Sequence, residues 1–138
     1  YFNFTGIVDP LTCEKLPAFD LVKQVNSEVR AYSPVFAGCS VLGVWHVGDS
    51  IPCGTKPLET MPHKKVKSLQ ISGNGGVLAL IENGSQTYLA IQNRDCINPA
   101  ILDISFTGKT LRHTPNGKFP YDSKPITLSP GNLAIFVL

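Results

Sequence analysis

The sequence contains one strong helix signal, and nearly everything after it has the pattern of short strands separated by turns. Apolar residues recur at the spacing of a helix that buries one face, at Ala18, Leu21, Val22, Val25, Val29 and Tyr32. Pro17 suits the first turn of such a helix and Pro34 suits its end. The pattern therefore predicts a helix over Leu16–Pro34.

A short segment before this helix has the composition of a strand. Residues Tyr1–Val8 are rich in aromatic and β-branched side chains, and Asp9-Pro10 follows as a break. Strand, loop and helix make one βα unit, which cannot bury both of its faces alone and normally belongs to a parallel sheet. Because no second such unit follows, we interpret residues 1–34 as the terminal unit of a larger structure.

The rest of the chain predicts about eight short strands. Gly, Pro and Asn mark the turns between them, in keeping with 12 glycines and 11 prolines, and Phe119-Pro120-Tyr121 is predicted to lie in a loop. Regularly spaced short strands are typical of an antiparallel sandwich or barrel. We expect a mainly β fold, an antiparallel β-sandwich over residues 35–138 with one N-terminal helix. The predicted strands are Ser40–Val47, Val66–Ile71, Val77–Glu82, Thr87–Asn93, Ala100–Phe106, Thr110–Thr114, Pro125–Leu128 and Leu133–Leu138.

Charge and cysteine spacing argue against several classes of function. The net charge is only +2 and no basic run exceeds Lys64-Lys65, so a nucleic-acid partner is not expected. No apolar run approaches the roughly 18 residues of a membrane span, so no membrane partner is expected either. The four cysteines show no metal-binding spacing, and neither a metal nor another cofactor is expected. Cys39 and Cys53 could pair in an oxidising compartment, or all four thiols could stay free and buried.

No catalytic constellation can be recognised. Asp9 follows a predicted strand, but a turn role before the helix is the simpler interpretation, and Asp95 and Asp122 have the surroundings of turn residues. Trp45 and His46 are neighbours on a strand and therefore point to opposite faces. Trp45 is expected in the core and His46 at the surface or an edge.

Aromatic side chains are the remaining candidates for a binding role. Sugar-binding proteins stack aromatic rings against the apolar faces of sugars. The candidate carbohydrate contacts are Trp45, Phe119 and Tyr121, the last two from a predicted loop, where binding residues are often displayed. A ring in such a loop can equally pack over the edge of a sheet.

Two groups of residues resemble the C-terminal part of a glycoside hydrolase-like protein. The first runs from Gly6–Asp9 through Leu21, Val22, Lys23, Val25, Asn26, Glu28, Val29, Pro34 and Val35 to Gly43–Gly48. It resembles the last βα unit of a (β/α)8 barrel in beta-galactosidase-like and related uncharacterised hydrolases. The second comprises Tyr88–Asp95, Gly108-Lys109 and Ile126–Leu138, and it resembles the β-sandwich appended to such barrels.

The resemblance implies a division of roles. Residues 1–34 would be the remnant of an upstream barrel, and residues 35–138 a non-catalytic accessory sandwich that packs on the barrel and stabilises it. One face of the helix is then expected to dock on the sandwich through Val25, Val29 and Tyr32, and Phe19 and Val22, on the face that would have met the barrel, are expected to be exposed. The family's catalytic carboxylates would lie upstream of Tyr1, so the chain is not expected to be an enzyme by itself. The expected partners are that barrel, a second copy of the fragment as a homodimer, and, in the alternative of a carbohydrate-binding module, a polysaccharide. The expected location is secreted or periplasmic.

Overall fold

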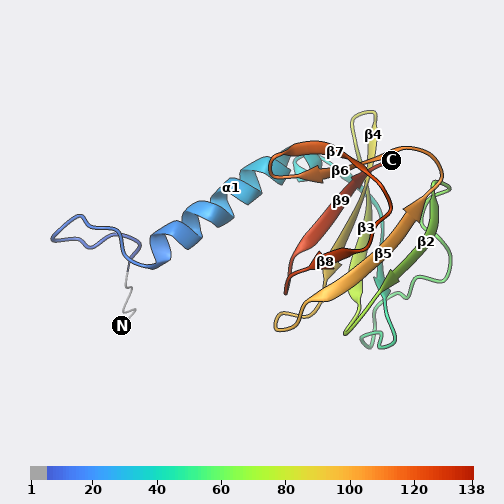
Figure 1. The fold of residues 1–138 in the computed structure, drawn as a ribbon, viewed down its shortest axis with the longest axis horizontal. Helices are drawn as coiled ribbons and strands as arrows, with labels where there is room; N and C mark the ends of the chain where they lie inside the picture. The colour runs from blue at the N-terminus through green and yellow to red at the C-terminus, as the bar shows by residue number, and fades with distance from the viewer. Residues whose placement is uncertain (1–5) are drawn as a thin grey trace.

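The computed structural model describes residues 6–138, and it consists of one helix projecting from a β-sandwich (Figure 1). Strand pairing is antiparallel within both sheets. The predicted mainly β sandwich with an N-terminal helix is confirmed. The elements are α1 (Ala18–Phe36), β1 (Ser40–Val47), β2 (Val66–Ile71), β3 (Gly76–Asn83), β4 (Gln86–Asn93), β5 (Ala100–Phe106), β6 (Thr110–Thr114), β7 (Gly117–Tyr121), β8 (Ile126–Leu128) and β9 (Leu133–Val137).

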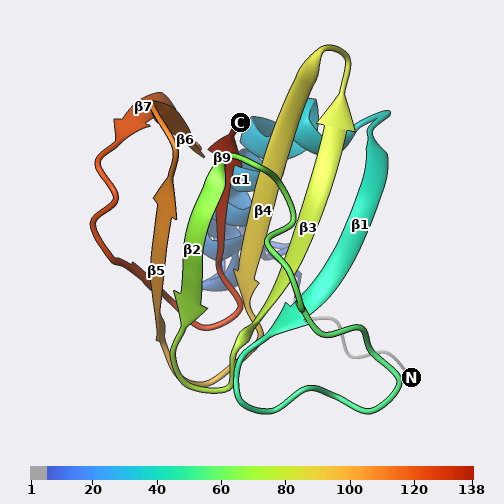
Figure 2. The same ribbon diagram turned by 90° about the vertical axis from the view of Figure 1, so that its right-hand side faces the viewer.

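The strands form a six-stranded sheet in the order β1-β3-β4-β9-β6-β7 and a three-stranded sheet in the order β2-β5-β8. Figure 2 shows the smaller sheet lying across one face of the larger one, with β1 and β7 at opposite edges. The main core fills the space between the sheets. Its alternation is clearest in β5, where Ala100, Leu102, Ile104 and Phe106 are buried and the residues between them face outward.

A second, smaller apolar cluster lies on the other face of the six-stranded sheet. There Ile81, Tyr88, Ala90 and Ile135 contact Val35 of α1. The large sheet thus has one face in the sandwich core and one face that the helix covers only in part.

Proline 34 lies inside α1, so its predicted role as a helix stop is wrong. A proline in this place leaves the carbonyl four residues earlier, that of Arg30, without its usual N–H donor. The Ser33 hydroxyl donates to that carbonyl instead, with 3.0 Å between Oγ and O. Satisfied in this way, the helix continues to Phe36.

The structure describes only the end of the segment that is predicted as the strand Tyr1–Val8. Of Tyr1–Val8, residues 1–5 lie outside the described residues, and Gly6–Val8 contain only an isolated bridge between Val8 and Lys15. Pro17 takes the position just before the helix, without a side-chain cap.

The hairpin of β6 and β7 corrects another prediction. Phe119, Pro120 and Tyr121 lie in strand β7, which pairs with β6 from Thr110↔Tyr121 to Thr114↔Gly117, so their predicted loop is wrong. With β7 included, residues 6–138 form nine strands, where the sequence predicts about eight. Pro120 is tolerated because β7 is an edge strand, whose outer side needs no N–H donor.

Candidate functional site

The helix is attached to the sheet only through its C-terminal turns. Val35 is fully buried against the small cluster on the sheet, and Tyr32 is half-buried beside it. The Tyr32 ring also meets the His113 ring edge-on, with 5.9 Å between centroids. Toward its N-terminus α1 extends away from the sandwich (Figure 1).

Asn83, at the end of β3, holds this attachment from the sheet side. Its amide Nδ2 lies 3.0, 3.2 and 2.9 Å from the carbonyl oxygens of Pro34, Val35 and Ala37, which share its two N–H groups. The last carbonyls of a helix have no partner within the helix. One side chain from the neighbouring hairpin therefore satisfies the end of α1.

Asn83→Ala is expected to destabilise the docked helix by about 1–3 kcal/mol, because three carbonyl oxygens lose their only side-chain donor. Asn83→Asp should be at least as harmful, since it also places a negative charge at the C-terminal end of the helix. Urea unfolding followed by circular dichroism measures both. Stability like that of the unsubstituted chain in both variants would contradict this role of Asn83.

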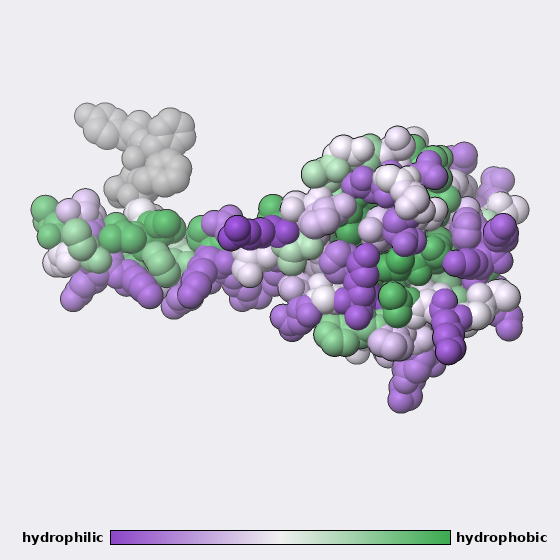
Figure 3. All heavy atoms as spheres, turned by 90° about the horizontal axis from the view of Figure 1, so that it is seen from above, coloured by the Kyte–Doolittle hydropathy of each residue, from purple (hydrophilic) through white to green (hydrophobic). Residues whose placement is uncertain are grey.

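Most of the apolar side of α1 faces solvent. Leu21, Val25 and Val29 are 63, 49 and 63% exposed. The prediction that Val25 and Val29 dock on the sandwich is therefore wrong, and only Tyr32 of the predicted set takes part in the contact. Figure 3 shows apolar side chains gathered on one side of the outer part of the projecting helix, with polar side chains on the other. We use the name helix stripe for the apolar residues of α1 that recur at helical spacing, which are Ala18, Leu21, Val22, Val25, Val29, Tyr32 and Phe36.

The helix stripe continues onto the uncovered part of the six-stranded sheet. A groove of about 530 Å³ runs between α1 and the turn that leads into β9, and Val25, Val29, Phe36 and Leu133 line it. A smaller hollow of about 170 Å³ adjoins it, lined by Phe36 and residues of β3, β4 and β9. At the β1 edge, Val41 and Val44 are 59 and 46% exposed. Helix and sheet together present one extended apolar surface.

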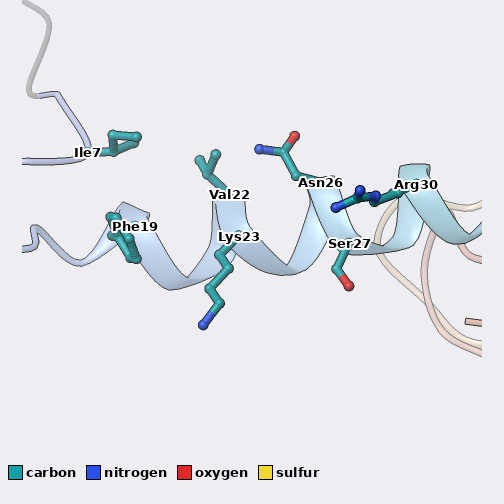
Figure 4. A pocket seen from close by; sticks show the side chains of 7 residues that line it. All are labelled: Ile7, Phe19, Val22, Lys23, Asn26, Ser27 and Arg30. Atoms are coloured by element: carbon teal, nitrogen blue, oxygen red, sulfur yellow. The ribbon is translucent and has the colours of Figure 1, made fainter. Parts of the chain in front are cut away.

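A shallow pocket of about 410 Å³ lies at the outer end of the helix (Figure 4). Ile7, Phe19 and Val22 form its apolar end, while Asn26 and Arg30 extend the same side of α1 toward the sandwich. The Lys15 ammonium lies 4.6 Å from the centroid of the Phe19 ring. Val22 is exposed, as expected for a face without a partner, whereas Phe19 is half-buried.

The three predicted carbohydrate contacts do not form one site. Trp45 lies on β1 and Phe119 and Tyr121 on β7, at opposite edges of the same sheet. Trp45 packs against the main core, as predicted for a core aromatic, and covers Gly43 so closely that no Cβ would fit there. Tyr121 also belongs to the core, with its ring 4.9 Å from that of Phe136. Of the three, Phe119 alone is exposed, at 50%.

His46 faces away from Trp45, as predicted, and lies at the β1 edge. The Arg94 guanidinium reaches its Nδ1 at 3.3 Å and also donates to the carbonyls of Ser50 and Asn74. These contacts join the long β1–β2 connection to the turn before β3. His46 is therefore part of a structural contact.

Asp9, Asp95 and Asp122 all lie in turns and stabilise them. Asp9 accepts from the backbone N–H groups of Leu11 and Thr12, which lowers the pKa of its carboxyl group. Asp95 accepts from the N–H groups of Ile97 and Asn98 with the same effect on its pKa. Asp122 pairs with Lys124 at 2.8 Å. The turn roles predicted for all three are confirmed.

The described residues contain no group of three or more His, Cys, Asp or Glu side chains placed to hold a metal ion. All four cysteines are free. The expectation of buried thiols is wrong, because Cys13, Cys53 and Cys96 are exposed and Cys39 is half-buried.

Burial lowers the pKa of both His63 and His113, so both rings favour the neutral form. Among residues 6–138, no helix is long and apolar enough to cross a bilayer.

The apolar surface and the exposed ring of Phe119 are therefore what the fold offers for binding. Sequence reasoning found both groups of residues but not their arrangement, because the strand order that places them has no local signal. Comparisons with models of known protein families, with curated proteins and with solved structures give no match.

Proposed function

We propose that the chain is a non-catalytic accessory β-sandwich that packs on the (β/α)8 barrel of a glycoside hydrolase-like protein and stabilises it. The observation that carries the proposal is the exposed apolar surface, made of the helix stripe and the uncovered outer face of the six-stranded sheet. Exposed apolar surfaces larger than a few hundred Å² are rare on monomers and mark interaction sites.

The shape of this surface supports a domain as its occupant. A 19-residue helix spans about 28 Å, at roughly 1.5 Å per residue, and only its last turns touch the sandwich. A partner that covers the stripe must lie beside the projecting helix and reach the sheet at the same time. The last helix of a barrel has these surroundings, with the barrel strands on one side and the appended sandwich at its end.

The test compares the isolated chain with the same chain fused to the barrel that the proposal requires, taken from the reading frame upstream of Tyr1; a frame that encodes no barrel there would refute the proposal. Val29→Asp is expected to leave the melting temperature of the isolated chain within about 2 °C, since Val29 is 63% exposed there. In the longer protein the same change should lower the melting temperature by several degrees, because the partner domain would bury Val29. Differential scanning calorimetry measures both.

Ser27→Glu is the matched control, because Ser27 lies on the side of α1 opposite the helix stripe. It should leave both proteins unchanged. A longer protein that is insensitive to Val29→Asp would refute the packing role. Turnover of aryl glycosides by the isolated chain, if it survives repurification and scales with protein, would refute the non-catalytic role.

A further inference from the structure

A groove of about 590 Å³ lies near the β7 edge of the sandwich, away from the helix stripe. The β6–β7 hairpin forms one side of it, and the connection from β7 into β8 forms the other; both are visible at the left of Figure 2. Its volume falls in the usual range of small-molecule sites. Its lining is polar and apolar in similar measure, unlike the surface beside α1.

Arg112 of β6 lines this groove and is half-buried, and no carboxylate among residues 6–138 forms an ion pair with it. Its buried Nε has no hydrogen-bond acceptor among these residues, so an incoming anion would meet the two Nη groups. Asp122 is the one carboxylate in the lining, and it is paired with Lys124 at 2.8 Å. A guanidinium presents several N–H donors in a rigid fork that matches a carboxylate. The position therefore favours an anion supplied from outside.

An aromatic ring lies next to this cation. Phe119 is the direct partner of Arg112 across the β6–β7 ladder, and 50% of its surface is exposed. Neighbouring Tyr121 is held in place, because its hydroxyl donates to the carbonyl oxygen of Ile104 or Lys124, at 3.2 and 2.7 Å, and its ring packs on Phe106 and Phe136. A rigid wall of this kind lowers the ordering cost of binding.

We propose that this groove binds an acidic saccharide, with the sugar carboxylate on Arg112 and the apolar face of the sugar ring on Phe119. A guanidinium next to an exposed aromatic ring suits a uronic acid unit, because this sugar carries both a carboxylate and an apolar ring face. The residues that line this groove differ from those of the groove beside α1 in the proposed domain-packing surface, so each proposal can fail without the other.

The experiment is titration calorimetry of the chain with trimers of galacturonate, glucuronate and mannuronate at low salt. At least one trimer should bind, and its fully methyl-esterified form, which keeps the rings but loses the charges, should bind at least about tenfold more weakly. Acetate and inorganic phosphate, tested alone, should bind more weakly than the acidic trimer, since neither has a ring to place on Phe119.

Two variants and one control assign the binding to this groove. Arg112→Gln is expected to weaken binding of the acidic trimer at least about tenfold, and Phe119→Ala to weaken both the acidic and the esterified form. Lys109→Gln removes an equal charge from the exposed turn before β6 and should change nothing. Arg112→Lys keeps the charge and changes only the shape of the cation. Thermal melting of every variant shows whether a loss of binding comes from a loss of fold.

The proposal is overturned if none of the three acidic trimers binds at millimolar concentration. It is equally overturned if the esterified trimer binds as well as the acidic one, or if acetate or phosphate alone binds as tightly. Equal binding by the Arg112→Gln and Lys109→Gln variants, both folded, would place any affinity elsewhere on the molecule.

Discussion

Replacing Val35 by aspartate is expected to lower the free energy of unfolding by about 2–4 kcal/mol. Val35 is fully buried between α1 and the outer face of the six-stranded sheet. A carboxylate there would lie in an apolar cluster without a cationic partner. Because α1 contacts the sheet only through its last turns, the substitution should first weaken the docking of the helix. The helix would then separate from an otherwise folded sandwich.

Val29→Asp is the matched control for this change, since the same substitution on the same helix meets solvent. With Val29 63% exposed, the expected change is within about 0.5 kcal/mol. Urea unfolding gives both free energies, and amide hydrogen exchange shows whether protection in α1 is lost before protection in β3 and β4. An equal loss of unfolding free energy in Val35→Asp and Val29→Asp would contradict the docking of the helix through Val35.

Asn93→Ala is expected to cost about 2–4 kcal/mol, an unusually large effect for the loss of a polar side chain. Asn93 is buried at the end of β4, with 1% of its surface exposed. Its Nδ2 is within hydrogen-bond distance of the carbonyl oxygens of Asn98, Leu128 and Ser129, while its Oδ1 accepts from the Asp95 N–H. Truncation leaves several buried backbone groups without partners.

Asn116→Ala is the control for that prediction, since Asn116 is exposed in the β6–β7 turn. It should leave stability within about 0.5 kcal/mol. Chemical denaturation at equilibrium measures the free energy of unfolding of both variants. Amide hydrogen exchange in the β4–β5 connection should also be slower in the unsubstituted chain than in Asn93→Ala. If Asn93→Ala cost no more stability than Asn116→Ala, the role of the Asn93 hydrogen bonds in joining β4 to the β8–β9 turn would be contradicted.

Strands whose ends are marked by local features can be predicted from the sequence. Alternating apolar residues or flanking turns mark both ends of four strands whose predicted bounds agree with the structure, Ser40–Val47, Val66–Ile71, Ala100–Phe106 and Thr110–Thr114. β7 was missed because a proline between two aromatic residues is typical of a loop. Only its place at an edge, which no local pattern shows, makes Pro120 compatible with a strand.

The helix was predicted correctly in kind but not in its contacts. Its apolar spacing could not reveal that the chain turns at Phe36 so that Val35, rather than Val25 and Val29, meets the sheet. The arrangement of the candidate carbohydrate contacts has no local signal either. The strand order places Trp45 and Phe119 at opposite edges of the sheet, and Phe119 pairs across the β6–β7 ladder with Arg112, which no motif marks.

The attachment of α1 through Asn83 has a consequence for how the protein should be produced. Asn83-Gly84-Ser85 matches the acceptor pattern for N-linked glycans, and the nitrogen that would carry the glycan is the one directed at three carbonyls of the helix end. A sugar on that nitrogen would occupy the space where α1 docks. In a eukaryotic secretory host, an attached glycan would therefore yield material whose helix stays undocked, whereas a bacterial host avoids this heterogeneity.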